Sequence, residues 1–264
     1  MNLSARATAI TIVDAIKATG TKAPKITEAF DKATRISTAA HGLGLPSGTL
    51  IAAVADALGD DRDPAADPEV GRIVTLSAIA GEGVMQGVTA IAFDDFRAVC
   101  SDERDDLVNA WQTPFDASVA TLEAAHDRIG HLALDETGPI LAKGGDIATV
   151  WAQARAAAGT IDTIAAGWIA LGTFTRAVSD DPRRRALRLV DVDYTTWVEA
   201  KLEHKRLTPW DAVLAGLTLS LPTFDEYRQR IARITAEVAD AERAFHADAL
   251  AYATGRPALV RIPR

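Results

Sequence analysis

The chain has 264 residues and a formal net charge of −8 at pH 7, with 48% hydrophobic and 24% charged residues. This length provides apolar surface for one large domain or two smaller ones, and the composition is that of a globular protein, which excludes a largely disordered chain. One cysteine, Cys100, excludes an intramolecular disulfide framework and a cysteine-based zinc site. Because free cysteines are usually buried, we expect Cys100 in the core.

Helix signals follow one another along the chain. Apolar residues recur with helical spacing, and glycine or proline stands near most helix ends. The predicted helices cover residues 3–19, 26–40, 49–58, 69–80, 84–99, 102–111, 113–132 and 146–175. Thr113 and Pro114 are placed as the N-cap and first residue of their helix, and Gly159 is a candidate break in the last one. Residues 186–192 are the one strand-like stretch, but a strand is not favoured there because it would have no ladder partner within the chain.

Two decamers of the chain resemble each other. Residues 208–217 repeat residues 113–122 with six of ten positions identical, beginning with Thr-Pro-aromatic-Asp in both. An internal duplication would leave such a trace. The repeated use of favourable residues at a helix start explains the likeness equally well.

The most regular pattern lies in the last predicted helix, residues 223–252, where Thr223 and Glu226 form a capping box. Its apolar residues advance alternately by three and four positions, which defines a heptad seam. In a parallel zipper Glu237 would face Glu242, so antiparallel packing within the chain's own bundle is favoured. The seam consists of Phe224, Tyr227, Ile231, Ile234, Val238, Ala241 and Phe245.

These patterns predict an all-α fold, a multi-helix bundle of about 8–10 helices whose long heptad-patterned C-terminal helix precedes an extended basic tail. We divide the chain into an N-terminal helical subdomain (1–59), an acidic loop with two prolines (60–68), a main helical bundle (69–253) and the tail (254–264). No secretory signal or membrane span is predicted, since no apolar run of about 20 residues occurs. With its single cysteine, the chain is therefore expected in the cytoplasm.

Charge is unevenly distributed along the chain. Residues 56–106 contain 13 acids and 4 bases, whereas the tail contains Arg256, Arg261 and Arg264 and no acid. An acidic surface repels nucleic acid and anionic membranes and favours a basic protein partner. We therefore expect protein partners, with self-association, and no nucleic acid. A solvated acidic face that only aids solubility would have the same composition.

Three motifs invite a metal or nucleotide hypothesis, and each lacks a necessary part. Glu123 and His126 form an E-x-x-H pair near His131, but a di-iron bundle needs a second such pair, which the sequence does not contain. His126 is therefore expected as a hydrogen-bonded core residue. Asp61 and Asp63 lack the later ligands of a calcium loop. The glycines at 81, 83 and 87 miss the dinucleotide spacing and favour a close approach of two helices or a turn.

One further cluster is basic. The arginines at positions 183–185 and 188 are expected in a local salt-bridge network or an anion contact, because nucleic-acid binding would require a broader basic face. The five tryptophans, at positions 111, 151, 168, 197 and 210, are mostly expected in the core or at interfaces.

No catalytic, cofactor-binding or metal-binding residue is predicted, and the sequence favours a non-enzyme without excluding an enzyme. The leading hypothesis is a structural or assembly protein that acts through helix packing and oligomerisation, such as a component of a virion or other large particle. In this hypothesis the tail of one subunit docks on residues 56–106 of a neighbour. The alternatives are a helical enzyme or small-ligand binder with a pocket near His126 or Trp168, and an acidic regulatory binding module.

Overall fold

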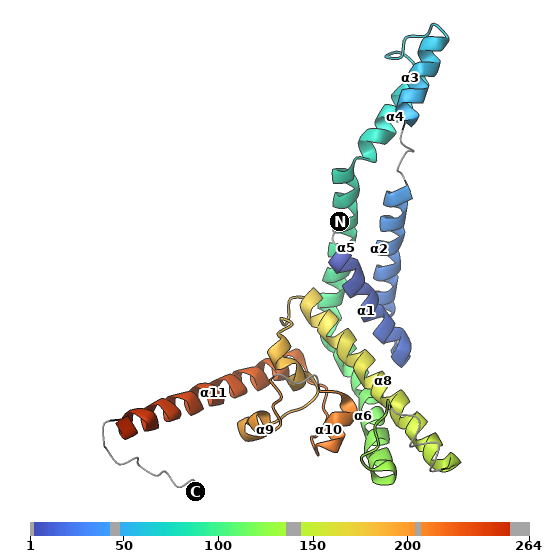
Figure 1. The fold of residues 1–264 in the computed structure, drawn as a ribbon. Coiled ribbons are helices and arrows are strands. Elements are labelled where there is room, and N and C mark those ends of the chain that lie inside the picture. Colours follow the sequence, from blue (N-terminus) through green and yellow to red (C-terminus); the bar gives the residue numbers. More distant parts are fainter. Residues whose placement is uncertain (1–2, 43–47, 136–143, 204–206, 254–264) are drawn as a thin grey trace. The chain divides into compact units, whose positions relative to one another are not determined.

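The computed structural model describes residues 3–42, 48–135, 144–203 and 207–253 (Figure 1). Among these residues the regular structure is helical and no strand is formed beyond a single bridge, which confirms the predicted all-α class. The helices are α1 (Leu3–Thr19), α2 (Pro24–Gly42), α3 (Thr49–Gly59), α4 (Pro68–Ile79), α5 (Glu82–Asp102), α6 (Arg104–Ile129), α8 (Gly145–Phe174), the 3₁₀ helix η1 (Pro182–Arg188), α9 (Tyr194–Glu199), α10 (Pro209–Leu214) and α11 (Phe224–Ala253). The predicted basic tail lies outside the described residues.

The chain forms two compact units. Unit 1 comprises Met1–Ala110 with Ala166–Arg176, and unit 2 comprises Trp111–Ala165 with Ala177–Arg264.

In unit 1, α2 packs along α5, and an aromatic cluster joins these helices to the end of α8. The ring of Phe96, from α5, lies 5.8 Å from the ring of Phe30 and 5.5 Å from that of Phe174, measured between centroids. The guanidinium carbon of Arg97 lies 5.1 Å from the Phe174 centroid, within the range of a cation–π contact. Three segments that are distant in sequence are therefore held by one apolar cluster.

The single thiol of the chain is buried in α5, as predicted. Burial raises the pKa of Cys100 to about 12. At pH 8 only about one thiol in ten thousand would then be ionised, and the thiolate is the reactive form. We therefore expect native protein not to react with a thiol-directed reagent such as 5,5′-dithiobis(2-nitrobenzoate), and to react fully in guanidinium chloride. A rapid reaction under native conditions would show that this part of α5 opens.

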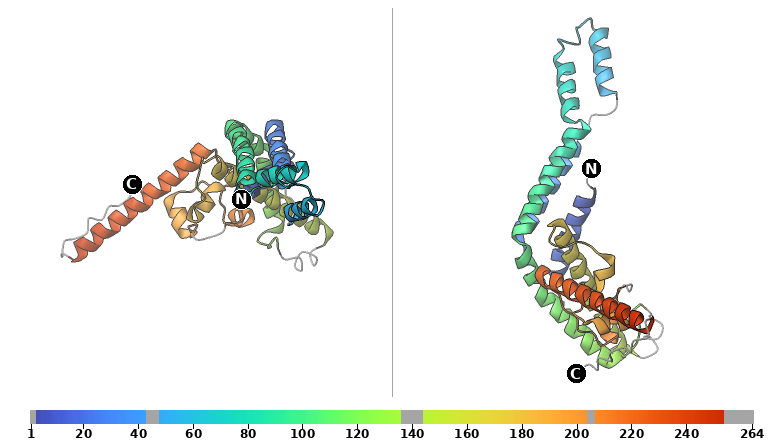
Figure 2. Two further views of the ribbon diagram at one scale, coloured as in Figure 1. Left: turned by 90° about the horizontal axis from the view of Figure 1, so that it is seen from above. Right: turned by 90° about the vertical axis from the view of Figure 1, so that its left-hand side faces the viewer.

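Also in unit 1, α3 and α4 form a helical hairpin in which the two helices lie side by side in every view (Figures 1 and 2). Asp67 caps α4, because its carboxylate accepts hydrogen bonds from the backbone amides of Glu69 (2.9 Å) and Val70 (3.1 Å) and also pairs with Arg62. Between α4 and α5, a Cβ atom on Gly81 would lie 3.0 Å from the Ala78 carbonyl oxygen. Gly81 therefore lies in a tight turn between helices, whereas Gly83 and Gly87 lie within α5, where a Cβ atom would meet nothing within 4 Å.

In unit 2, the predicted helix start at Thr113 and Pro114 is wrong, since α6 continues through both residues. Trp111 and Phe115 are fully buried and lie four positions apart, on one face of the helix. Burying both side chains on one face requires an unbroken helix, and this packing outweighs the local preference of proline for a helix start. The helix α8 likewise runs through Gly159 without a break, with Ala157 and Ile161 buried on either side of this glycine.

Residues 186–192 are strand-like in composition but form no strand, as expected for a stretch without a ladder partner. They contain the end of η1, and only Val190 makes an isolated antiparallel bridge, to Leu219. The backbone amide of Ser220 donates to the Leu189 carbonyl at 2.8 Å beside this bridge. An isolated strand lacks a ladder of partners, so one bridge is all that this segment forms.

Candidate interaction surfaces

The heptad seam of α11 is buried at its N-terminal end and exposed at its C-terminal end. Phe224, Tyr227 and Ile234 are buried, whereas Phe245 is 71% exposed. The buried part packs on η1 and α9, and the C-terminal half of α11 extends away from α9 and α10 (Figure 1). The later part of the seam therefore has an apolar face that the described residues of its own unit do not cover.

The N-terminal half of α11 is fixed to its unit by polar contacts. The guanidinium of Arg230 donates to the Leu187 carbonyl (3.1 Å) and to the Ser220 hydroxyl (2.8 Å), and its Nε lies 3.9 Å from the Asp191 carboxylate. Arg233 pairs with the same carboxylate, on the next turn of the helix. These contacts give the exposed half of α11 a well-anchored base.

The second candidate surface is the hairpin of α3 and α4. In α3, Asp56 is the one charged residue, yet only Ala57 is buried. Helices that are apolar on all sides are normally buried within a protein or a membrane. Ile51, Ala55 and Leu58 recur with helical spacing on one side of α3 and are exposed, Ile51 to 76%. In α4, Val74 and Ile79 are also exposed.

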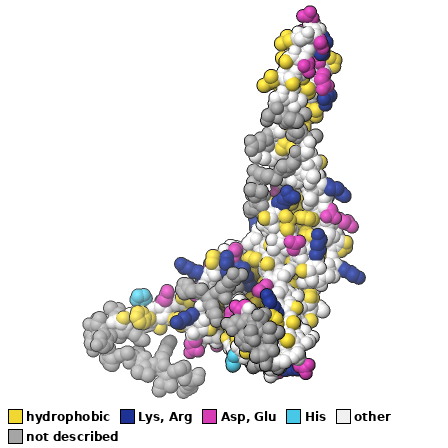
Figure 3. All heavy atoms as spheres, turned by 45° about the vertical axis from the view of Figure 1, so that its right-hand side comes forward, with side chains coloured by type: hydrophobic (Ala, Val, Ile, Leu, Met, Phe, Trp, Pro, Cys, Tyr) yellow, Lys and Arg dark blue, Asp and Glu magenta, His cyan; other side chains and the backbone are white. Residues whose placement is uncertain are grey.

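Acidic side chains border this apolar surface, and Figure 3 shows apolar and acidic side chains together at the end of the α3–α4 hairpin. Some of the acids are neutralised locally: Arg62 pairs with Asp60 (3.0 Å) and Asp67, and Arg72 pairs with Glu69 (2.6 Å). Asp56, Asp61 and Asp63 make no ion pair with any described residue. The hairpin therefore presents apolar side chains beside uncompensated negative charge.

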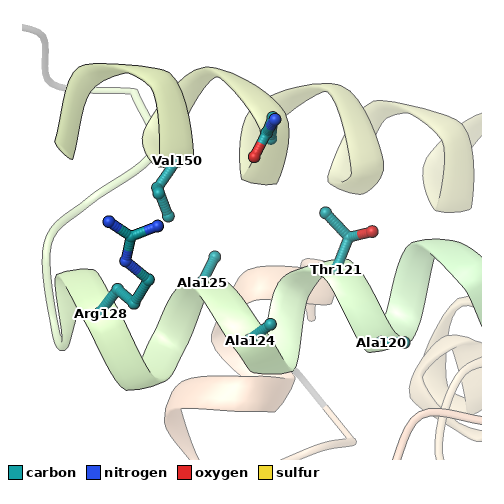
Figure 4. A pocket seen from close by; sticks show the side chains of 7 residues that line it. Ala120, Thr121, Ala124, Ala125, Arg128 and Val150 are labelled. Carbon is teal, nitrogen blue, oxygen red and sulfur yellow. The ribbon is translucent and has the colours of Figure 1, made fainter. Parts of the chain in front are cut away.

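A shallow groove of about 370 Å³ lies between α6 and α8 in unit 2 (Figure 4). Its lining contains no acid, histidine or cysteine, and its hydroxyl group, on Thr121, already donates to the Ala117 carbonyl at 2.9 Å. These groups provide neither a nucleophile nor an acid–base pair. The lining residues are Ala120, Thr121, Ala124, Ala125, Arg128, Val150 and Gln153.

The histidines singled out in the sequence lie near this groove without forming a metal site. The half-buried ring of His126 meets the rings of His131 and Trp210 edge to face, with centroids 5.7 and 6.1 Å apart. The Trp210 indole donates to the Leu132 carbonyl at 2.9 Å and holds α10 against the end of α6. Among the described residues, no group of three or more potential ligands is arranged to bind a metal ion.

The arginine cluster forms the predicted salt-bridge network. Arg185 and Arg188 both pair with Asp180, the former at 3.3 Å, and Arg184 lies 3.9 Å from Asp181. These attractions hold the pKa of Asp180 below its ordinary value although its burial acts in the opposite direction. These three arginines thus stabilise η1, whereas Arg183 is exposed and makes no ion pair with a described residue.

Among the described helices, no single one is long and apolar enough to cross a membrane. Pro68–Ile79 and Gly83–Asp102 meet the length and composition test only as a pair bent by 49°.

Comparison with models of protein families, with curated proteins and with solved structures finds no match to this chain. The exposed part of the α11 seam and the α3–α4 hairpin are therefore the features of the chain that indicate a function. The seam of α11 follows from its period in the sequence. The hairpin surface was missed, although the single charge in the 11 residues of α3 was a signal for it.

Proposed function

We propose that the chain is a structural or assembly protein that associates with further copies of itself through helix packing, as a component of a virion or other large particle would. The observation that carries this proposal is the change in burial along the α11 seam. The seam is buried at Phe224 and Tyr227, while Phe245 is 71% exposed on the same face of the same helix. An apolar helix face that its own unit leaves exposed is typical of a site where another helix binds.

The charges beside the seam restrict the partner helix. Glu237 and Glu242 flank the exposed part, so a parallel copy of α11 would place like charges opposite each other. A helix of different sequence or opposite direction avoids this repulsion. In this proposal α11 and the basic segment 254–264 are the parts of the chain that contact neighbouring copies.

The test measures native mass by size-exclusion chromatography with light scattering. We expect the wild-type mass to be a multiple of 28.0 kDa. Phe245→Ser is expected to weaken association at least about tenfold, because burying a phenylalanine contributes about 1.5–3 kcal/mol. Since Phe245 is exposed within the chain, the melting temperature of the dissociated variant should match that of its folded parent monomer.

The matched control is Val198→Ser, which removes another exposed apolar side chain, 51% exposed, from α9 of the same unit. This variant should associate like the wild type. A wild-type mass of 28.0 kDa at high protein concentration would refute the proposal.

A further inference from the structure

We infer that the α3–α4 hairpin surface is the docking site for residues 254–264 of a second copy of this chain. The inference deepens the proposed self-association and rests on it. We define the hairpin surface by its apolar residues Ile51, Ala55, Leu58, Val74 and Ile79 and by the acids Asp56, Asp61 and Asp63.

Exposed apolar side chains concentrate in this part of the molecule. Of the ten large hydrophobic residues exposed among the described residues, seven belong to α3, α4 and α5. Three of these, Val84, Val88 and Ile91, recur with helical spacing along α5. Soluble monomers rarely expose contiguous apolar patches of this kind, and larger ones mark an interaction site. A two-helix hairpin covers only one side of each of its helices, so a third element is needed to bury α3.

The charge of the hairpin selects among possible third elements. Residues 49–79 contain six acids and two bases, a net charge of −4. A second hairpin would therefore meet this surface with charge of the same sign, which is unfavourable. A zwitterionic or anionic lipid surface would gain nothing from the acids. A basic, partly apolar segment satisfies both properties of the surface.

Residues 254–264 have that composition. They include Arg256, Arg261 and Arg264 without any acid, giving a charge of +3, and they include Leu259, Val260 and Ile262. Pro257 and Pro263 disfavour a helix, and an extended segment fits along the line between two packed helices. The segment directly follows α11, whose C-terminal half is largely exposed. The arginines then face the unpaired acids while the aliphatic side chains cover Ile51 and Leu58.

Disulfide trapping between two full-length chains tests this docking. One chain carries Ala55→Cys and the other, distinguished by an N-terminal tag, carries Ala258→Cys. Native Cys100 is buried and does not compete. After mixing and oxidation with glutathione disulfide, we expect a mixed disulfide dimer on a non-reducing gel. The matched control places the cysteine at Ala117, an exposed alanine of α6.

Charge reversal sharpens the test. Replacing Arg256, Arg261 and Arg264 by glutamate is expected to slow trapping about tenfold or more, because three weak ion pairs become repulsive. Replacing Asp56, Asp61 and Asp63 by lysine in the receiving chain should restore the rate. This rescue would not occur if the substitutions merely disturbed folding.

Four results would overturn the inference. Trapping at Ala117 could be as fast as trapping at Ala55, or charge reversal could leave the trapping rate unchanged. The disulfide could form only within a chain that carries both cysteines, or the protein could float with phosphatidylcholine vesicles and show no trapping. If the wild type assembles but no trapping occurs, only the docking is refuted and self-association stands. If the wild type is monomeric, self-association itself is refuted.

Discussion

Phe96→Ala is expected to lower the free energy of unfolding of unit 1 by about 3–5 kcal/mol, the range for removing a large buried aromatic side chain. Phe96 is 1% exposed and contacts the rings of both Phe30 and Phe174. The substitution removes two edge or tilted ring contacts and leaves a cavity at the point where α2, α5 and the end of α8 meet. Chemical denaturation followed by circular dichroism measures the loss.

The control for this prediction is Phe245→Ala, the same substitution at a phenylalanine that is 71% exposed. Its effect on unfolding should stay within about 0.5 kcal/mol, measured at a concentration where the protein is monomeric. If the two variants lost equal stability, the Phe96 cluster would not be the core of unit 1. Phe96→Leu, which keeps more of the buried volume, should recover part of the loss.

The sequence predicted those helices whose ends carry strong local signals. The first helix has the predicted bounds, Leu3–Thr19, because its apolar spacing is regular and Gly20 adopts φ 65°, a left-handed conformation that glycine adopts without strain. The capping box predicted at Thr223 and Glu226 is present, with the Glu226 carboxylate 2.7 Å from the Thr223 amide. In both places a few adjacent residues determine the structure.

Where packing decides the structure, local signals were insufficient, and the two similar decamers show why. At Thr208 the Thr-Pro-Trp-Asp sequence starts a short helix with a full capping box. At Thr113 the corresponding sequence lies inside α6. The difference arises from a residue outside the decamers: Trp111 precedes residues 113–122 and is buried on the same helix face as Phe115. A likeness of ten residues therefore did not specify a likeness of structure.

The candidate surfaces divide in the same way. The heptad period of the α11 seam can be read from the sequence. The half of the seam that is buried is determined by the tertiary contacts of α11 with η1 and α9. The hairpin surface depends on the absence of a third helix against α3 among the described residues, and no local pattern encodes that absence. Acidic composition identified the region of Asp56 and Asp61 but not its apolar component.

Arg230→Met is expected to lower the free energy of unfolding of unit 2 by about 2–3 kcal/mol, because it leaves buried hydrogen-bonding groups without partners. Arg230 is 8% exposed, and its guanidinium donates to Leu187 and Ser220. Methionine preserves much of the aliphatic packing but offers no donor, so the loss reports these hydrogen bonds. Because Asp191 is half-exposed, water solvates its carboxylate after the substitution and limits the cost.

Arg228→Met on the same helix is the matched control. Arg228 is exposed, and among the described residues its one ion pair is with Asp225, one helical turn away; such surface pairs contribute about 0.3–0.5 kcal/mol. Urea denaturation should therefore separate the two variants by about 2 kcal/mol with unchanged m-values. An equally small effect at both positions would mean that Arg230 does not anchor α11. The exposed seam would then lack the fixed base that presents Phe245 to a neighbouring copy, and Arg230→Met would leave the native mass unchanged. If Arg230 does anchor the seam, Arg230→Met must weaken association together with stability.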